Sequence, residues 1–260
     1  KVPQEALISS MRDHQKYFHI VDAKGALLPA FITVSNIRSR TPARVRTGNE
    51  RVLNARLADA KFFWETDAIR PLSARTEALK NVLFHHALGS LAGKTRRIEK
   101  LSAKIAQAVG APTPVCIRAA SLCKADLVSG MVGEFPDLQG IMGRYLARHD
   151  GEPAAVARAI EEHYLPRHAG GALPQSPAGQ VLALADRLDS LVGLFIAGEE
   201  PTGEKDPYGL RRAALGVIRI LVEKKLDLNV AALVEDAADG YASDGLVSGE
   251  SAKSQCTTFI

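Results

Sequence analysis

The chain has 260 residues, a hydrophobic fraction of 46%, a charged fraction of 24% and a formal net charge of +4. These values are those of a globular protein with one large or two ordinary domains, and no run of 18 or more apolar residues offers a membrane span. Three cysteines without a CxxC pair argue against a disulfide framework or a structural zinc site, and they fit a reducing cytoplasm. Five acids and one base follow Val234, so the preceding body is basic and compatible with an RNA partner.

The N-terminal stretch has a mixed α/β pattern. A weak apolar stripe predicts a helix over 3–16, and two β-rich runs predict strands at 17–21 and 27–34. Pro29 lacks a backbone N–H, which favours an edge position for the second strand. We therefore predict that residues 1–48 form a small α/β segment, part of an incomplete domain.

Helical periodicity dominates the rest of the chain to about residue 235. Prolines stand where several helices should begin, and Gly110 stands where one should end. The predicted helices cover 49–66, 73–88, 90–109, 112–132, 137–149, 153–163, 177–197, 207–224 and 229–239. The expected fold class is mainly α, with a helical domain over 49–239. Residues 240–260 are rich in small and polar side chains without apolar periodicity, which predicts a flexible linker or tail.

Three basic clusters are candidates for contact with RNA phosphates. The first is an arginine run between residues 38 and 51 that contains one acid, Glu50; a solvated connector, or pairing with acids elsewhere, is the alternative. The second lies on one predicted helix, where residues 97, 100 and 104 share a face. The third opens the helix after Asp206-Pro207; its arginines could instead bridge to Asp186 or Asp189. The candidates in the second and third clusters are Lys94, Arg96, Arg97, Lys100, Lys104, Arg211 and Arg212.

Five long strings of the sequence are distinctive: MRDHQKYFHIVDAKGALLPAFITVSNI (11–37), NERVLNARLADAKFFWETD (49–67), LCKADLVSGMVGEFPDLQGIMGRYLA (122–147), HYLPRHAGGALPQSPAGQVLALADRLDSLVGLF (163–195) and GEKDPYGLRRAALGVIRIL (203–221). These strings resemble the β subunit of bacterial two-subunit glycyl-tRNA synthetase. The resemblance implies a central fragment of a large subunit in a cytoplasmic heterotetramer. A separate α subunit would join glycine and ATP, while the β subunit binds glycine tRNA and supports assembly, without a membrane. ATP and Mg²⁺ are expected for the whole enzyme, and no cofactor or catalytic residue is expected in this part.

Within that family, residues 72–221 resemble an HD-type helical domain, in which metal is held by a His, an adjacent His-Asp pair and a distant Asp. The corresponding positions here are His85 or His86, then Asp126, then Asp186 or Asp189. The residue directly before Asp126 is not a His, and the ammonium of nearby Lys124 has no lone pair to offer a metal. The resemblance therefore predicts an HD-like fold with a degenerate, metal-free site.

Two other functions stay open. One is an HD-type metal-dependent phosphohydrolase, and the other is a purely structural scaffold module. Sequence signatures of several other enzyme classes are absent, because the chain has no GxxxxGK[ST], HExxH or GxSxG motif.

Overall fold

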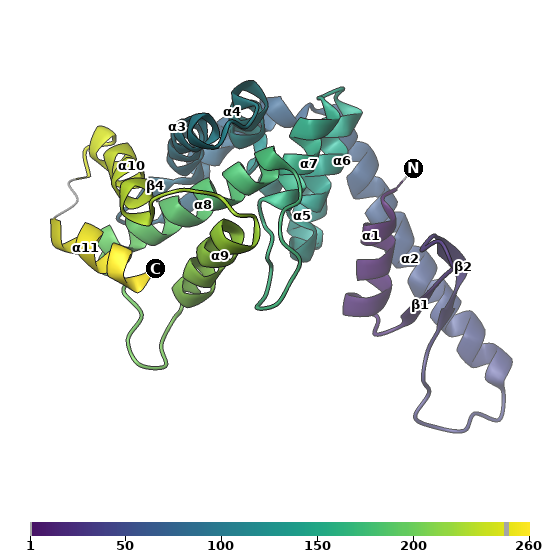
Figure 1. Ribbon diagram of the computed structural model, residues 1–260. Helices are drawn as coiled ribbons and strands as arrows, with labels where there is room; N and C mark the ends of the chain where they lie inside the picture. Colours follow the sequence, from purple (N-terminus) through teal and green to yellow (C-terminus); the bar gives the residue numbers. More distant parts are fainter. Residues whose placement is uncertain (1, 247–249) are drawn as a thin grey trace. The chain divides into compact units, whose positions relative to one another are not determined.

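The computed structural model describes residues 2–246 and 250–260, which divide into two compact units. The first unit comprises Lys1–Arg70 and Ser129–Gln139, and the second comprises Pro71–Val128 and Gly140–Ile260. Helices dominate the described residues (Figure 1), which confirms the mainly α prediction. The division differs from the predicted one, because a boundary between 48 and 49 would fall inside a helix.

The first unit joins a hairpin to a long helix. Its elements are α1 (Gln4–Ser9), the π-helical turn η1 (Ser10–His14), β1 (Phe18–Val21), β2 (Leu27–Ile32), α2 (Pro42–Ile69), α5 (Gly130–Glu134) and the 3₁₀ turn η4 (Pro136–Leu138). The two strands are antiparallel, with Phe18 opposite Ile32. The predicted strand positions are confirmed, and α2 begins seven residues earlier than predicted because Pro42 suits a first helical turn.

The core of the first unit is small. Met11, Tyr17 and Leu53 form it, and the partly buried residues packed against them are Leu7, Leu27, Phe31 and Leu57. The Tyr17 hydroxyl also donates to Asn49 Oδ1 over 2.5 Å, which ties the strand region to α2. Few side chains therefore hold the hairpin on the helix.

A buried carboxylate attaches α5 to α2 although about sixty residues separate them in sequence. Asp67 is 4% exposed. Its oxygens accept the backbone N–H groups of Gly130 at 3.0 Å and Met131 at 2.8 Å. These N–H groups open α5 and have no partner within the helix, so Asp67 satisfies them from outside.

The second unit is built around α8 (Figure 1). Its elements are η2 (Leu72–Asn81), β3 (Leu83–His85), β4 (Gly89–Ser90), α3 (Leu91–Val109), α4 (Thr113–Leu122), η3 (Ala125–Val128), α6 (Ile141–His149), α7 (Ala154–Glu162), α8 (Pro177–Ile196), α9 (Leu210–Glu223), α10 (Val230–Ser243) and α11 (Glu250–Phe259). Helix α8 contacts α3, α4, α7, α9, α10 and α11. Most of its residues are buried, as expected for a helix that is apolar on nearly all sides.

Several helix ends follow the sequence signals. Gly110 adopts φ 66° after α3, and the next N–H, of Ala111, donates to Ala106 O at 2.8 Å. Helix α8 begins at Pro177, with the Ser176 hydroxyl accepting from Gly179 N–H. The helix predicted to open after Asp206-Pro207 begins three residues later, at Leu210, with Gly209 at its N-cap. Asp206 accepts from Leu210 and Arg211 N–H.

Three predicted stretches have a different structure. The helix expected over 73–88 is a 3₁₀ turn followed by a short hairpin, in which Gly89 takes φ 84°. The helix expected over 112–132 is interrupted by η3 at 125–128, where Asp126 is buried. The flexible tail expected over 240–260 is wrong for most of its length. Helix α10 continues to Ser243 and Glu250–Phe259 forms α11, with Cys256 buried, while 247–249 lie outside the described residues.

Among the described residues, no helix has both the length and the apolar character that a membrane span requires.

Candidate functional site

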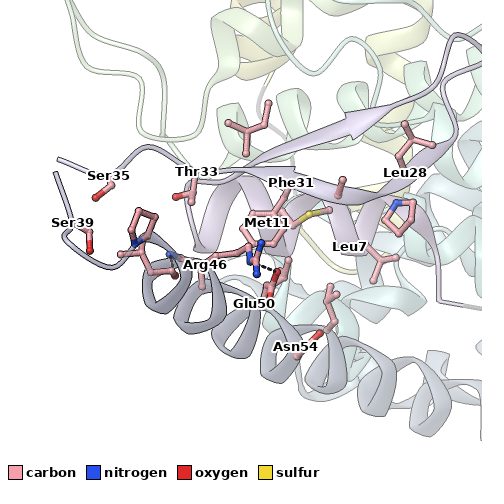
Figure 2. A pocket seen from close by; sticks show the side chains of 18 of the residues that line it. Leu7, Met11, Leu28, Phe31, Thr33, Ser35, Ser39, Arg46, Glu50 and Asn54 are labelled. Carbon is pink, nitrogen blue, oxygen red and sulfur yellow. Dashed lines mark hydrogen bonds and ion pairs between the residues drawn. The ribbon is translucent and has the colours of Figure 1, made fainter. Parts of the chain in front are cut away.

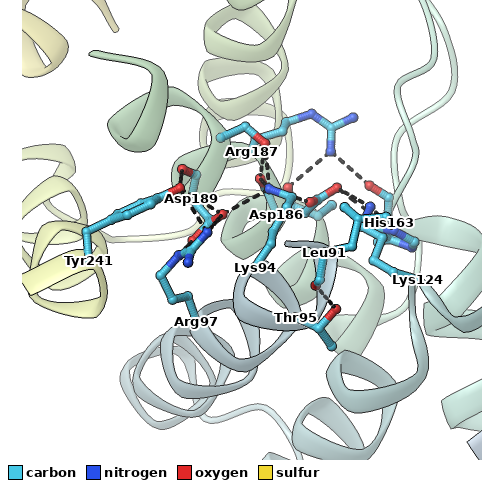
Figure 3. A network of polar contacts seen from close by, with 12 residues as sticks. Leu91, Lys94, Thr95, Arg97, Lys124, His163, Asp186, Arg187, Asp189 and Tyr241 are labelled. Atoms are coloured by element: carbon cyan, nitrogen blue, oxygen red, sulfur yellow. Dashed lines mark hydrogen bonds and ion pairs between the residues drawn. The ribbon is translucent and has the colours of Figure 1, made fainter. Parts of the chain in front are cut away.

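A buried set of charged side chains links α3 and α8 with neighbouring segments of the second unit (Figure 3). We call it the buried charge network, and its members are Lys94, Arg97, Lys124, His163, Asp186, Asp189 and Tyr241, with the exposed Asp244 at one end. Helix α3 supplies Lys94, whose ammonium lies 3.1 Å from Asp186 Oδ1 and 3.0 Å from Asp189 Oδ2. The same ammonium donates to the Ser190 hydroxyl at 2.7 Å. One lysine thus bridges two carboxylates on consecutive turns of α8.

Arg97 connects α3 with both α8 and the end of α10. Its Nε donates to Asp189 Oδ1 at 2.7 Å, and a terminal nitrogen donates to Asp244 Oδ2 at 2.9 Å. The guanidinium also stacks over the Tyr241 ring at 4.0 Å. Burial disfavours its charged form, but the Asp189 carboxylate outweighs burial and raises the pKa of Arg97. The guanidinium is therefore a fixed cation that holds three helices together.

Lys124 lies between a histidine and a carboxylate. Its ammonium is 2.9 Å from His163 Nε2 and 2.8 Å from Asp186 Oδ2. Because an ammonium can only donate, Nε2 accepts, and the proton on His163 Nδ1 goes to Ile160 O at 2.5 Å. Burial and the Lys124 charge hold the pKa of His163 well below its usual value. This histidine is therefore neutral.

Charge is balanced within the buried charge network. Three cations, Lys94, Arg97 and Lys124, face three carboxylates, Asp186, Asp189 and Asp244. Burial raises the pKa of Asp186, but the nearby Lys124 and Lys94 ammonium groups outweigh it, so the pKa lies well below the usual value. Each charge of this network has a partner of opposite charge within it, so the network acts as a structural tie between helices.

The five HD-like positions do not form a metal-ligand set in the described part of the chain. Two of them, Asp186 and Asp189, bond to the basic side chains of the buried charge network. Asp126 is buried and accepts from Gly140 N–H at 2.6 Å and Gly143 N–H at 2.9 Å, and burial raises its pKa to about 6. His85 Nε2 lies 3.4 Å from Glu199 Oε1, and the His86 ring lies beside the His85 ring, tilted by 41° with the centroids 4.1 Å apart. Among residues 2–246 and 250–260, no group of three or more His, Cys, Asp or Glu is arranged to hold a metal.

The predicted basic row on α3 is not an open surface. Lys94 and Arg97 are each 3% exposed. Lys104 lies 2.6 Å from Asp236 and 3.5 Å from Asp239. Both acids lie on α10, within the helix predicted over 229–239, and this helix packs on α3. Contact of Lys94 or Arg97 with RNA is therefore incompatible with this packing, whereas Arg96 and Lys100 are exposed and stay candidates.

Arg211 and Arg212 lie exposed at the start of α9. A terminal nitrogen of Arg211 donates to Gly203 O at 2.7 Å. Among the described residues, neither arginine forms the alternative bridge to Asp186 or Asp189, whose carboxylates are engaged by α3 and Lys124. Contact of this pair with tRNA stays a prediction.

The arginine run of the first unit lies at the surface. We call it the arginine surface, and its members are Arg38, Arg40, Arg44, Arg46 and Arg51, all exposed. Glu50 lies 3.7 Å from Arg46, and both side chains are largely in solvent. Within the described residues, the other four arginines form no ion pair. The alternative of pairing with acids elsewhere is thus not realised in this part of the chain.

His163, like Tyr241, is a residue of the site that the sequence did not single out. It follows α7 directly, and no motif connects it to Lys124, thirty-nine residues earlier. Only the packing of α7 against α4 and α8 brings the two side chains together.

The second unit is thus a helical module in which buried charged groups hold helices together. A sequence model of the family described as "Glycyl-tRNA synthetase beta subunit" matches residues 1–260. The chain belongs to this family.

Curated relatives agree with this assignment, and each is named "Glycine--tRNA ligase beta subunit". The protein of Chromohalobacter salexigens is 56% identical over 250 residues, covering 95% of this chain and 36% of the relative. That of Pseudomonas putida strain GB-1 is 52% identical over 243 residues, covering 94% and 36%. That of Aromatoleum aromaticum is 51% identical over 259 residues, covering 100% and 37%. The chain thus spans little more than a third of the relatives' length.

Proposed function

We propose that this chain acts within the β subunit of a glycine–tRNA ligase and contributes tRNA binding and subunit assembly to ATP-dependent glycyl-tRNA formation. The observation that carries the proposal is the family match over all 260 residues, together with relatives that are 52% and 56% identical to the chain over the aligned residues. Adenylation would take place in a separate α subunit, and the whole enzyme would use ATP and Mg²⁺ in the cytoplasm. Glycine tRNA and the α subunit are the proposed partners.

The arginine surface supports the tRNA-binding part of this proposal. Guanidinium groups bind phosphates in a bidentate manner, and phosphate contacts supply most of the affinity for nucleic acids. Arg44 and Arg51 are seven residues apart on α2, so they lie on one face, about 10 Å apart along the helix axis. Gly48 lies between them, and a Cβ added there would have nothing within 4 Å. An RNA backbone can therefore approach the helix closely at this point.

A salt titration with glycine tRNA tests the tRNA contact. We expect binding that weakens steeply with salt, and the Arg44→Ala/Arg51→Ala double variant should reduce the slope of log K against log salt by about 1 for each lost phosphate contact. Arg12→Ala is the matched control, because Arg12 is also exposed in the first unit but pairs with Asp13 at 2.8 Å. The same slope in the double variant and the wild-type chain would exclude the arginine surface as the contact.

Enzymatic function is tested separately. The complete β subunit mixed with the α subunit should form glycyl-tRNA, and neither subunit alone should. Failure of the mixture would reject the ligase assignment, whereas loss of activity only in the double variant would place the defect in tRNA binding.

A further inference from the structure

A wide groove lies between β2 and α2 in the first unit (Figure 2). Its volume is about 1240 Å³. Met11, Phe31 and Leu53 line it from the side of the small core, and Leu28, Ile32 and Ile37 line it from the strand and the following loop. Its polar rim includes the Arg46–Glu50 ion pair. The groove is therefore mainly apolar and large enough for several side chains.

The hairpin is apolar on both faces, although only one face is covered. Leu27 and Phe31 pack on the core next to α2. Leu28 is 41% exposed, Ile32 is 55% exposed and Phe18, opposite Ile32, is 61% exposed. A strand with apolar residues at consecutive positions is typical of a sheet buried on both sides. The sequence of β2 is thus that of a buried strand.

The hairpin also lacks a neighbouring strand. Among the described residues, β2 pairs with β1 alone, so its second edge is open. A two-stranded sheet is marginally stable in water, and an open apolar edge is a site for pairing with a further strand. Pro29 supplies no N–H to such a pairing, so the bonds would come from the residues on either side of it.

We propose that an extended, apolar segment of the same subunit, from outside these 260 residues, lies in this groove and pairs with the open edge of β2. The relatives are nearly three times as long as this chain, which spans 36% of them, so their subunits contain ample further polypeptide. A covalently connected segment has an effective concentration in the millimolar range, which gives it an advantage over a separate partner. The apolar lining suits a peptide of this kind and does not suit the phosphate backbone of RNA.

The proposal rests on family membership and does not depend on Arg44 or Arg51, although Arg38 and Arg46 of the arginine surface also line the groove. Loss of tRNA binding through Arg44 and Arg51 would leave the groove filled, and an empty groove would leave these two arginines exposed to tRNA. The two proposals can therefore fail separately.

Hydrogen exchange measured on the complete subunit and on this 260-residue chain tests the proposal. We expect the backbone N–H groups of β2 to exchange at least about 100-fold more slowly in the complete subunit, because pairing with a strand protects them. The N–H groups of α8, which is buried in both forms, serve as the internal reference. Equal exchange of β2 in both forms would overturn the proposal.

Other occupants give different outcomes. Protection that appears in the 260-residue chain and rises with its concentration would indicate a second copy and overturn the proposal. Protection of the complete subunit that requires added α subunit or tRNA would also overturn it.

A pair of variants of the complete subunit adds a second measurement. Ile32→Asp places a charge in the groove and should abolish the protection of β2 while α8 exchange stays unchanged. Val222→Asp is the matched control, since Val222 is 69% exposed on α9 in the second unit, and it should leave β2 protected. Ile32→Ala keeps the strand uncharged and should lower the protection only partly. Full protection in Ile32→Asp would contradict a segment bound in the groove.

Discussion

Removal of the Lys124 ammonium is the sharpest test of the buried charge network. In Lys124→Met, the Asp186 carboxylate loses a partner at 2.8 Å and His163 loses the donor to Nε2. Breaking a buried ion pair on one side costs about 3–5 kcal/mol of stability. Because Lys94 still lies 3.1 Å from Asp186, we expect the lower end of that range, about 3 kcal/mol at pH 7.

The assay is urea unfolding followed by far-UV circular dichroism, which reports the helices that make up most of the second unit. A double variant, Lys124→Met/Asp186→Asn, removes the uncompensated charge as well as the cation. It should be more stable than the sum of the two single losses predicts, by about 0.5–3 kcal/mol. A cost below about 1 kcal/mol for Lys124→Met, or strict additivity, would refute a structural role for this pair.

The pH dependence gives a second readout of the same variant. His163 and Asp186 both have a folded pKa below the unfolded one, so each contributes stability that is present above its unfolded pKa and is lost as pH falls. For His163 the loss begins below about pH 6.5, and for Asp186 below about pH 4. Without the Lys124 charge, both groups take up protons more easily. The cost of Lys124→Met should therefore shrink as pH falls from 7 to 4, and a cost that grows in this interval would contradict the assignment.

Three further predictions concern other buried groups. Gly143→Ala should destabilise the chain by about 1–3 kcal/mol, because the added Cβ would lie 2.6 Å from Ile160 Cγ2, whereas Gly133→Ala, with open space around it, should be close to neutral in the same urea assay. Asp67→Ala should cost about 1–3 kcal/mol by leaving the buried N–H of Met131 and the partly buried N–H of Gly130 unsatisfied, and thermal unfolding would show it. The Asp126 carboxyl should titrate near pH 6 by NMR, so its contribution to stability is full below about pH 4 and lost as pH rises through 6; a midpoint below 4 would contradict its burial.

Local signals in the sequence predicted the elements whose causes are local. Pro177 and Gly110 mark helix ends through backbone geometry alone, and α8 is recognisable as a buried helix because apolar residues surround it. The helix predicted over 73–88 is wrong because its last residues belong to a short hairpin, in which His85 lies opposite Gly89. Alternation over a three-residue strand is too short to outweigh a longer helical pattern.

The burial and ion pairs of the basic residues on α3 could not be predicted, because their acidic partners are distant in sequence. Arg97 pairs with Asp189 and Asp244, ninety-two and one hundred and forty-seven residues away. A row of cations at helical spacing looks the same whether it faces solvent or a second helix with acids. The sequence therefore identified Lys94, Arg97 and Lys104 as one cluster of bases and could not assign them to the interior or to ion pairs with α10.

The first unit is made of two separate stretches of the chain, and this limits how the two units can be separated by proteolysis or truncation. Residues 129–139 belong to the first unit, yet they are covalently flanked on both sides by the second. The backbone passes between the units three times, so no single cleavage can release either of them. A protein that lacks the first seventy residues would retain α5 but lose Asp67, which accepts the Met131 N–H. Phe135, buried in the intact chain, would also lose the His14 ring, whose centroid lies 5.1 Å from its own. Any attempt to obtain the second unit alone must therefore replace 129–139 with a short linker as well as remove the first seventy residues.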